Sequence, residues 1–190
     1  FSLPTLHQLY KSDHNIELVV TQPDRPKGRG RKSIPPPVKQ FASEKKIPVL
    51  QPKKCTSPEV VKILGELNAD VFIVVAFGQI LDKNLLALPH HFCINLHSSL
   101  LPKYRGAAPI NWAIINGETE TGVTTMKMNA GLDTGDILLS RKVLIRNKDD
   151  AQSLHDTLAH QGSSLVMETL NQLDSGSLEA TSQNSDLASY

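Results

Sequence analysis

One stretch of the chain restricts its fold more than any other. Residues 70–76 have the sequence DVFIVVA, which is apolar at nearly every position instead of at every second one. Such a run is typical of a parallel β-strand that is covered on both faces. Residues 92–97 (FCINLH) form a second buried strand, which ends in polar residues. Because helical stretches separate the strand-like runs, the sequence predicts an α/β domain with a mostly parallel sheet.

The remaining elements follow from the spacing of apolar residues. Helices are predicted where these residues recur with helical periodicity, at residues 1–11, 36–45, 58–67, 108–115 and 152–173. Further strands are predicted at the β-branched runs of residues 16–21, 47–51, 123–128 and 137–145. Residues 175–190 are polar, and we expect them to be irregular. The predicted fold is a Rossmann-like, mostly parallel twisted sheet with helices on both faces.

The order of the elements bears on domain organisation. A doubly wound sheet usually begins with a strand, whereas the first element predicted here is a helix. We therefore expect residues 1–175 to be an N-terminally truncated domain whose first strand is missing. Residues 176–190 are expected to begin a linker to a further, absent domain. The length of 190 residues suits one large domain.

Composition excludes several classes of protein. Hydrophobic residues make up 39% and charged residues 21% of the chain, as is usual in globular proteins. No apolar run approaches the roughly 18 residues of a membrane-spanning helix, and no signal peptide opens the chain. The two cysteines, Cys55 and Cys93, are too few for a disulfide framework and form no metal-ligand pair. We expect them to be reduced, buried thiols of a cytosolic protein.

Two polar residues lie at the end of the second buried strand. Asn95 and His97 are two positions apart, so their side chains point to the same face, about 6–7 Å apart along the strand. A polar pair in a core strand costs free energy unless it is hydrogen-bonded or used. Sites of open α/β sheets lie at the carboxyl ends of the strands. The pair is therefore either a hydrogen-bonded end of the strand or part of a functional site.

A second candidate site residue is Asp133, within the sequence AGLDTGD of residues 130–136. Glycines on either side allow a sharp turn that holds a carboxylate in a cleft, although an ordinary Asp/Gly turn has the same composition. Asp-Thr-Gly also occurs in aspartic proteases. Their chemistry needs two apposed carboxylates, whereas this chain has one copy of the motif in an α/β context. The protease hypothesis is therefore rejected.

The third feature is a basic run on a segment rich in proline and glycine. Five cations fall within residues 25–32: Arg25, Lys27, Arg29, Arg31 and Lys32. The net charge of the chain is only +1, so any affinity for a polyanion must come from a local patch. A solvated basic loop is one interpretation. Because the run follows a strand at the predicted site edge, electrostatic contact with a polyanion is favoured. The glycine spacing matches neither G-x-G-x-x-G nor a P-loop.

These residues together resemble a known family. Residues 95–102 (NLHSSLLP), followed by residues 105–110 (RGAAPI), are similar to the signature of folate-dependent formyltransferases. Residues 131–136 (GLDTGD) resemble the second motif of that family. The basic run, continuing to residues 37–39, resembles the tRNA-contacting loop of methionyl-tRNA formyltransferases. The similarity covers essentially the whole chain. Ser98 stands where bacterial members commonly carry glycine.

The resemblance implies a formyltransferase fold and an activity. A formyl group passes from 10-formyltetrahydrofolate to the amino group of methionyl-initiator tRNA, for translation initiation, without a metal. Asn95 and His97 would donate hydrogen bonds to the formyl oxygen, and Asp133 would orient His97 and accept the proton of the amine. The residues implied to contact formyl-folate are Ser99, Leu100, Leu101, Pro102, Phe77, Gly78, Gln79 and Ile80. The residues implied to contact tRNA are Arg25, Lys27, Arg29, Arg31 and Lys32. We expect a monomer without a membrane partner, in the bacterial cytoplasm or an organellar matrix.

Two alternatives remain open. A formyltransferase acting on a small nucleotide amine, of the glycinamide ribonucleotide type, shares the catalytic motifs but generally lacks the basic loop. A non-catalytic RNA-binding module would account for the basic run and leave Asn95, His97 and Asp133 without a role. Formyl transfer to charged tRNA or to glycinamide ribotide separates the two enzymes. Folate binding separates both enzymes from the RNA-binding module.

Overall fold

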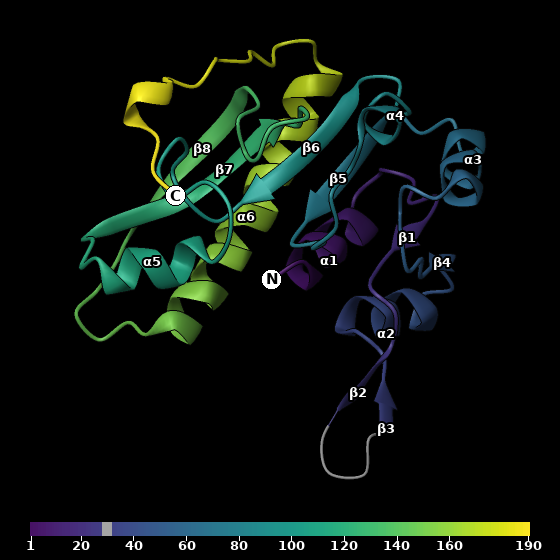
Figure 1. Cartoon of the computed structure of the whole chain (residues 1–190), viewed down its shortest axis with the longest axis horizontal. Helices are drawn as coiled ribbons and strands as arrows, with labels where there is room; N and C mark the ends of the chain where they lie inside the picture. The colour runs from purple at the N-terminus through teal and green to yellow at the C-terminus, as the bar shows by residue number, and fades with distance from the viewer. Residues whose placement is uncertain (28–31) are drawn as a thin grey trace.

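The computed structural model describes residues 1–27 and 32–190, and within these residues the strands form three sheets (Figure 1). The largest has the order β5-β6-β7-β8, with bounds Val71–Val75, Phe92–His97, Glu120–Lys127 and Ile137–Leu144. β5 and β6 are parallel, whereas β7 and β8 continue the sheet in antiparallel pairing. A separate parallel pair joins β1 (Val19–Val20) to β4 (Val49–Leu50). The third sheet is the hairpin of β2 (Arg25–Lys27) and β3 (Lys32–Ile34).

Helices cover both faces of the four-stranded sheet. On one face, Val71, Ile73 and Val75 of β5 pack into a core that includes residues of α1 (Leu3–Lys11), α5 (Pro109–Ile115) and α6 (Ala151–Asp174). On the other face, Phe72 packs with residues of α3 (Pro58–Glu66) and α4 (Lys83–Leu86). The alternation arises because successive side chains of a strand point to opposite faces. The predicted α/β fold with helices on both faces is confirmed, and its sheet is mixed.

α6 carries most of the main core. The buried leucines Leu154, Leu158 and Leu165 lie on one face of the helix, against Ile94 and Leu96 of β6. The approach is close, because a Cβ atom built on Gly162 would lie 2.7 Å from Cδ2 of Leu96. A capping box begins the helix: Asp150 Oδ1 accepts from Ser153 N at 2.8 Å, and Ser153 Oγ accepts from Asp150 N at 3.0 Å. These local signals explain why the helix was predictable from sequence.

The predicted helices agree with α1, α2 (Pro37–Glu44), α3, α5 and α6 to within two residues at each end. The strands predicted at residues 16–21 and 47–51 are much shorter in the structure, since β1 and β4 pair only with each other among the described residues. The short helix α4 was not predicted. The basic segment, expected to be a loop, contains the β2–β3 hairpin at its described ends. None of the described helices is long and apolar enough to cross a membrane.

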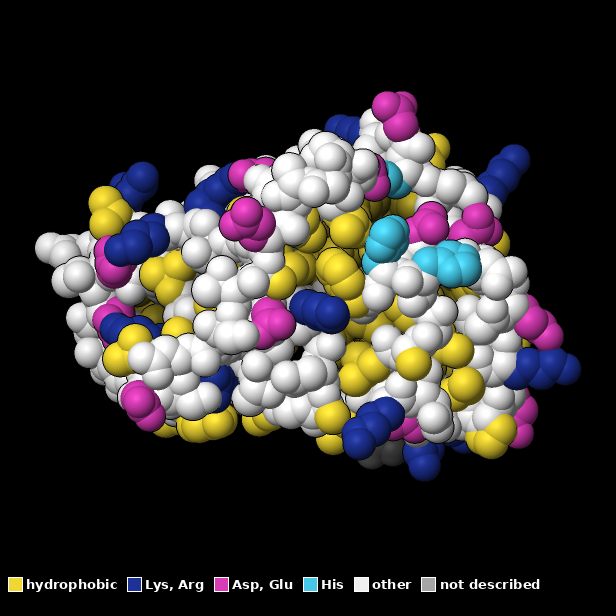
Figure 2. Space-filling view, turned by 90° about the horizontal axis from the view of Figure 1, so that it is seen from above, with side chains coloured by type: hydrophobic (Ala, Val, Ile, Leu, Met, Phe, Trp, Pro, Cys, Tyr) yellow, Lys and Arg dark blue, Asp and Glu magenta, His cyan; other side chains and the backbone are white. Residues whose placement is uncertain are grey.

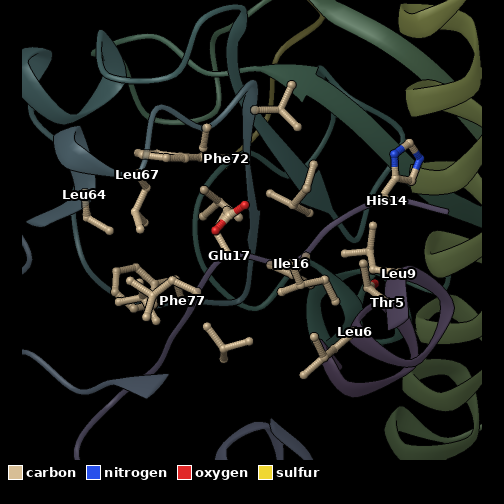
Figure 3. Close-up of a pocket in the computed structure, with 18 of the residues that line it drawn as sticks. Thr5, Leu6, Leu9, His14, Ile16, Glu17, Leu64, Leu67, Phe72 and Phe77 are labelled. Carbon is tan, nitrogen blue, oxygen red and sulfur yellow. The ribbon is translucent and has the colours of Figure 1, made fainter. Parts of the chain in front are cut away.

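A cavity of about 770 Å³ separates β1 from β5. Its lining is largely apolar and includes Leu6, Ile16, Phe72 and Phe77 (Figure 3). The space-filling view likewise shows hydrophobic side chains gathered in a hollow of the surface (Figure 2). Every residue of β5 is consequently half-buried. The prediction that this strand is covered on both faces is confirmed, because Val71 and Ile73 pack on one face and Phe72 on the other, whereas one of its edges adjoins the cavity.

Candidate active site

His97 lies at the carboxyl end of β6 and is 7% exposed. Its Nε2 is 2.8 Å from the carbonyl oxygen of Tyr104. Because a carbonyl oxygen only accepts, Nε2 carries a proton and donates it to this bond. Nδ1 faces Oδ2 of Asp133 at 3.6 Å, which is longer than an ordinary hydrogen bond. Nδ1 is therefore the ring nitrogen that remains available to a further partner beside the carboxylate.

Asn95 lies in the same strand, between Val74 of β5 and Met126 of β7. The neighbouring residues Ile94 and Leu96 point to the core formed with α6. Strand alternation places Asn95 and His97 together on the opposite face, as the sequence spacing predicted. His97 also makes a hydrogen bond to the turn that follows the strand, which was the alternative interpretation of the polar pair. The residue therefore has this structural role and also lies beside Asp133.

Asp133 sits in the loop between β7 and β8 with a φ of 52°, in the left-handed region that few residues other than glycine adopt. Its Oδ2 accepts a hydrogen bond from the backbone N–H of Gly106 at 2.7 Å. The flanking glycines are required by close contacts. A Cβ atom on Gly131 would lie 2.1 Å from Oγ1 of Thr134, and one on Gly135 would lie 1.7 Å from the carbonyl oxygen of Lys127. These close contacts therefore restrict the backbone shape of the loop that carries the carboxylate beside His97.

The contact at Gly135 leads to a stability prediction. Gly135→Ala should lower the free energy of unfolding by about 1–3 kcal/mol, because the backbone carbonyl of Lys127 must move to admit the methyl group. Gly65→Ala is the matched control. It lies within α3, and its Cβ would meet only Cδ2 of Leu88, at 3.5 Å. It should raise the free energy of unfolding by roughly 0.5–1 kcal/mol. Urea denaturation measures both changes, and an equally tolerated Gly135→Ala would contradict the close approach.

The turn after β6 carries the residues implied to contact folate. The Ser99 hydroxyl is buried and donates to the carbonyl oxygen of Lys103 at 2.5 Å. Thr124 Oγ1 of β7 donates to Ser99 O at 2.7 Å and accepts from Leu101 N at 3.2 Å. The peptide bond between Leu101 and Pro102 is cis. These contacts shape the turn and engage the Ser99 hydroxyl within the protein.

Residues 77–80 follow β5 and are tied to other segments. Phe77 packs with the α3 and α4 core, and its carbonyl oxygen accepts from Nε2 of Gln22 at 2.8 Å. Gln79 Oε1 accepts from Cys55 N at 2.8 Å. Gly78 has a φ of 73°, which favours glycine, and Ile80 is 87% exposed. Of these four residues, Ile80 has the most exposed side chain.

The base of the β2–β3 hairpin is anchored to the domain. Lys39 Nζ contacts Oδ2 of Asp24 at 2.7 Å, and Gln51 Nε2 donates to Oδ1 of Asp24 at 2.7 Å. Both hydrogen bonds lower the pKa of the Asp24 carboxyl, and the one from Lys39 has the larger effect. Lys39, which belongs to the basic stretch noted in the sequence, is thus paired within the protein.

The cations of the hairpin are only partly described. Arg25 is exposed, and its guanidinium donates to Oε1 of Gln22 at 3.4 Å. The backbone of Lys27 pairs with that of Lys32, and Arg29 and Arg31 lie outside the described residues. The hairpin extends away from the four-stranded sheet (Figure 1). The structure therefore does not bring Arg25 together with Asn95, His97 and Asp133.

Both cysteines are free and buried. Burial raises the pKa of the Cys93 thiol to about 12 and also raises the pKa of the Cys55 thiol. Neither is therefore an activated nucleophile at neutral pH. In the described part of the chain, no group of three or more His, Cys, Asp or Glu side chains could hold a metal ion.

Several site contacts were not predicted from the sequence. Tyr104 and Gly106 hold His97 and Asp133 through their backbone, and Gln183 contacts the loop that carries Asp133. The RGAAPI motif was a signal for the neighbourhood of Gly106. No sequence pattern indicated Gln183, because it lies 50 residues beyond Asp133 in a polar tail.

Comparison with known proteins assigns this arrangement to a class. Residues 3–170 match the model of the formyl transferase family, and the chain belongs to that family. It is 57% identical to a methionyl-tRNA formyltransferase of Geobacter metallireducens over 100% of this chain and 61% of the relative. It is 51% identical to the methionyl-tRNA formyltransferase of Caldanaerobacter subterraneus subsp. tengcongensis, over 100% of this chain and 62% of the relative. The chain thus spans about 61% of the length of such relatives.

Solved structures with the same fold include a glycinamide ribonucleotide transformylase from Symbiobacterium toebii. The TM-score is 0.77 at 16% identity, covering 95% of this chain and 89% of that one. A phosphoribosylglycinamide formyltransferase from Bacillus halodurans has a TM-score of 0.72 at 25% identity, covering 88% of this chain and 84% of that one. The formyltransferase fold implied by the sequence is therefore confirmed.

Proposed function

We propose that this chain is the catalytic domain of an enzyme that formylates methionyl-initiator tRNA with 10-formyltetrahydrofolate, in the bacterial cytoplasm. The observation that carries the proposal is the 57% identity to a methionyl-tRNA formyltransferase along the whole chain. The test is a formyl-transfer assay of the complete protein with 10-formyltetrahydrofolate and methionyl-tRNA, compared with glycinamide ribotide as acceptor. Transfer to glycinamide ribotide alone would contradict the proposal.

In the proposed reaction, the methionyl amine attacks the formyl carbon, and negative charge develops on the formyl oxygen. Asn95 donates an amide N–H to this oxygen. His97 donates from Nδ1, because Nε2 already donates to Tyr104. Donation from Nδ1 requires the imidazolium form, whose charge is stabilised by the Asp133 carboxylate 3.6 Å away. A preorganised donor of this kind typically contributes about 3–4 kcal/mol.

Asp133 also has a role in moving the proton. The amine loses its proton to Asp133, directly or through a water molecule. The carbonyl of the formyl group then re-forms as the bond between N10 of the folate and the formyl carbon breaks, and N10 takes up the proton from Asp133. General acid–base catalysis of this kind contributes about 10²–10⁴-fold. The amine is itself the nucleophile, so the proposal needs no activated side chain, in accord with the buried thiols.

Formyl-folate is the proposed donor. A sugar 3N-formyl transferase with this fold was solved in the presence of 5-N-formyl-THF, at 23% identity and a TM-score of 0.73. We propose that the turn from Ser99 through Leu100 and Leu101 to Pro102 contacts the folate through its backbone and apolar side chains, because the Ser99 hydroxyl is engaged with Lys103. Phe77, Gly78, Gln79 and Ile80 are proposed to flank the pterin.

The basic hairpin is the proposed contact with tRNA. Its five cations are Arg25, Lys27, Arg29, Arg31 and Lys32. Arg25 is exposed on an element that extends from the body of the domain, where a large polyanion can reach it (Figure 1). A small-substrate formyltransferase is the second candidate, because transformylases of glycinamide ribonucleotide share the fold.

The cavity between β1 and β5 supports a proposal about domain organisation. We propose that residues 1–175 form a catalytic domain whose sheet accepts one further extended, apolar strand in this cavity, and that residues 176–190 begin a linker. β1 and β5 both adjoin the cavity and belong to separate sheets. Thr5 Oγ1 lines the same cavity and is buried without a hydrogen-bond partner among the described residues. A strand backbone would supply that partner.

The strand proposal predicts a gain in protection. A six-residue apolar segment fused ahead of Phe1 should raise the thermal unfolding midpoint and slow amide exchange in β1 and β5 by about tenfold or more, because their free edges become paired. A fusion with prolines at alternate positions is the control, since proline cannot donate to a sheet. Equal exchange rates in both fusions would contradict the proposal.

A further inference from the structure

The segment of residues 181–190 lies across the loops that carry the proposed site. Thr181 forms an antiparallel bridge with Ile137 at the start of β8, with both hydrogen bonds at 2.8 Å. Near the other end of the segment, Ser189 O accepts from Arg105 N at 2.8 Å, and Ser189 Oγ accepts from Tyr104 N at 2.9 Å. The segment is thus attached both beside the Asp133 loop and at the turn that follows β6 (Figure 1).

Gln183 connects these two loops with a single carboxamide. Its Oε1 accepts from Nε and Nη2 of Arg105 at 3.0 and 2.9 Å. Its Nε2 donates to the carbonyl oxygens of Asp133 and Gly135 at 2.9 and 2.7 Å. Arg105 is only 4% exposed, so water competes little for its guanidinium. The carboxamide therefore joins the turn after β6 to the backbone of the Asp133 loop, at Asp133 itself and at Gly135.

The position of the Asp133 side chain depends on that backbone. The residue has a left-handed φ of 52°, and its carboxylate meets both Gly106 N–H and the imidazole of His97. The hydrogen bonds from Gln183 fix the carbonyl of Asp133 itself and that of Gly135. If these bonds were absent, the loop could relax and carry the carboxylate away from His97.

We propose that Gln183 is a positioning residue, which holds Asp133 in place for formyl transfer by bonding its loop to Arg105. The inference rests on the proposed function of the Asp133–His97 pair. A carboxamide suits this role because one end accepts from a guanidinium while the other end donates to carbonyl oxygens. A glutamate at this position could accept from Arg105 but would place an acceptor oxygen against the two carbonyl oxygens. A methionine of similar size could form neither set of hydrogen bonds.

The test uses Gln183→Met and Gln183→Glu in the complete protein. Both variants should lower kcat about tenfold or more, while the KM values for methionyl-tRNA and formyl-folate change less than about threefold. Glu retains the contact with Arg105, so a role confined to Arg105 predicts that Gln183→Glu restores kcat. Ser182→Ala is the matched control: it removes the neighbouring bond from Ser182 Oγ to Asp136 Oδ1, at 3.0 Å, and should leave kcat unchanged.

A second readout does not depend on activity. Exchange of the Gly106 amide, which donates to Asp133, should be about tenfold faster in both Gln183 variants and unchanged in Ser182→Ala. Normal kcat and normal Gly106 exchange in Gln183→Met would overturn the inference while the proposed function stands. Full activity of Asp133→Asn, assayed alongside, would overturn the proposed role of Asp133 and, with it, the role of Gln183. A thermal unfolding midpoint near that of the parent protein excludes loss of fold as the cause of low kcat.

Discussion

Asp133→Asn is expected to lower the turnover number for formyl transfer by about 10²-fold or more. Asparagine retains an oxygen that can accept the Gly106 N–H, so the loop should keep its shape. The substitution removes both the negative charge beside His97 Nδ1 and the group that takes the proton of the amine. Single-turnover formyl transfer with the complete protein measures the effect, because it isolates the chemical step from product release.

Asp136→Asn provides the control for Asp133→Asn. Asp136 belongs to the same motif, but its carboxylate accepts from Ser182 Oγ instead of approaching His97. Its replacement should change the turnover number by less than about threefold, and tRNA binding should be the same for both variants. Near-normal turnover of Asp133→Asn would mean that Asp133 is only a turn residue, and the proposed chemistry would fail.

Removing positive charge from the basic hairpin is expected to have the second large effect. The triple replacement of Arg25, Arg29 and Arg31 by alanine should raise the KM for methionyl-tRNA by about tenfold or more, with little change in folate binding. Each lost phosphate contact should reduce the slope of log affinity against log salt by about 0.7–0.9. Steady-state kinetics and binding at several salt concentrations measure both quantities.

The matched control for the hairpin removes the same charge elsewhere. Lys53, Lys54 and Lys62 are exposed and lie outside the hairpin, so their replacement by alanine changes the net charge equally. This control should leave the KM for tRNA and its salt dependence nearly unchanged. Equal effects of the two triple variants would show that only overall charge matters. An unchanged KM in the hairpin variant would favour the small-substrate formyltransferase.

Local patterns in the sequence determined where the helices and strands of this protein lie. The periodicity of residues 152–173 predicted α6, and its Asp150 capping box confirms why the helix begins there. The spacing of Asn95 and His97 correctly placed both on one face of β6, because strand alternation depends on neighbouring residues alone. The glycines around Asp133 indicated a turn that holds a carboxylate, and the contacts at Gly131 and Gly135 give the physical reason.

Only the tertiary structure decided how these elements meet. The antiparallel pairing of β7 and β8, the edge of β5 beside the cavity and the hydrogen bond from Gly106 to Asp133 depend on long-range packing. Gln183 is the clearest case, since 78 residues separate it from Arg105. Such contacts produce no periodic pattern in the sequence, because the residues between the two partners take no part in the contact. The sequence therefore determined which residues could form the site, and folding decided which backbone and side-chain groups hold them there.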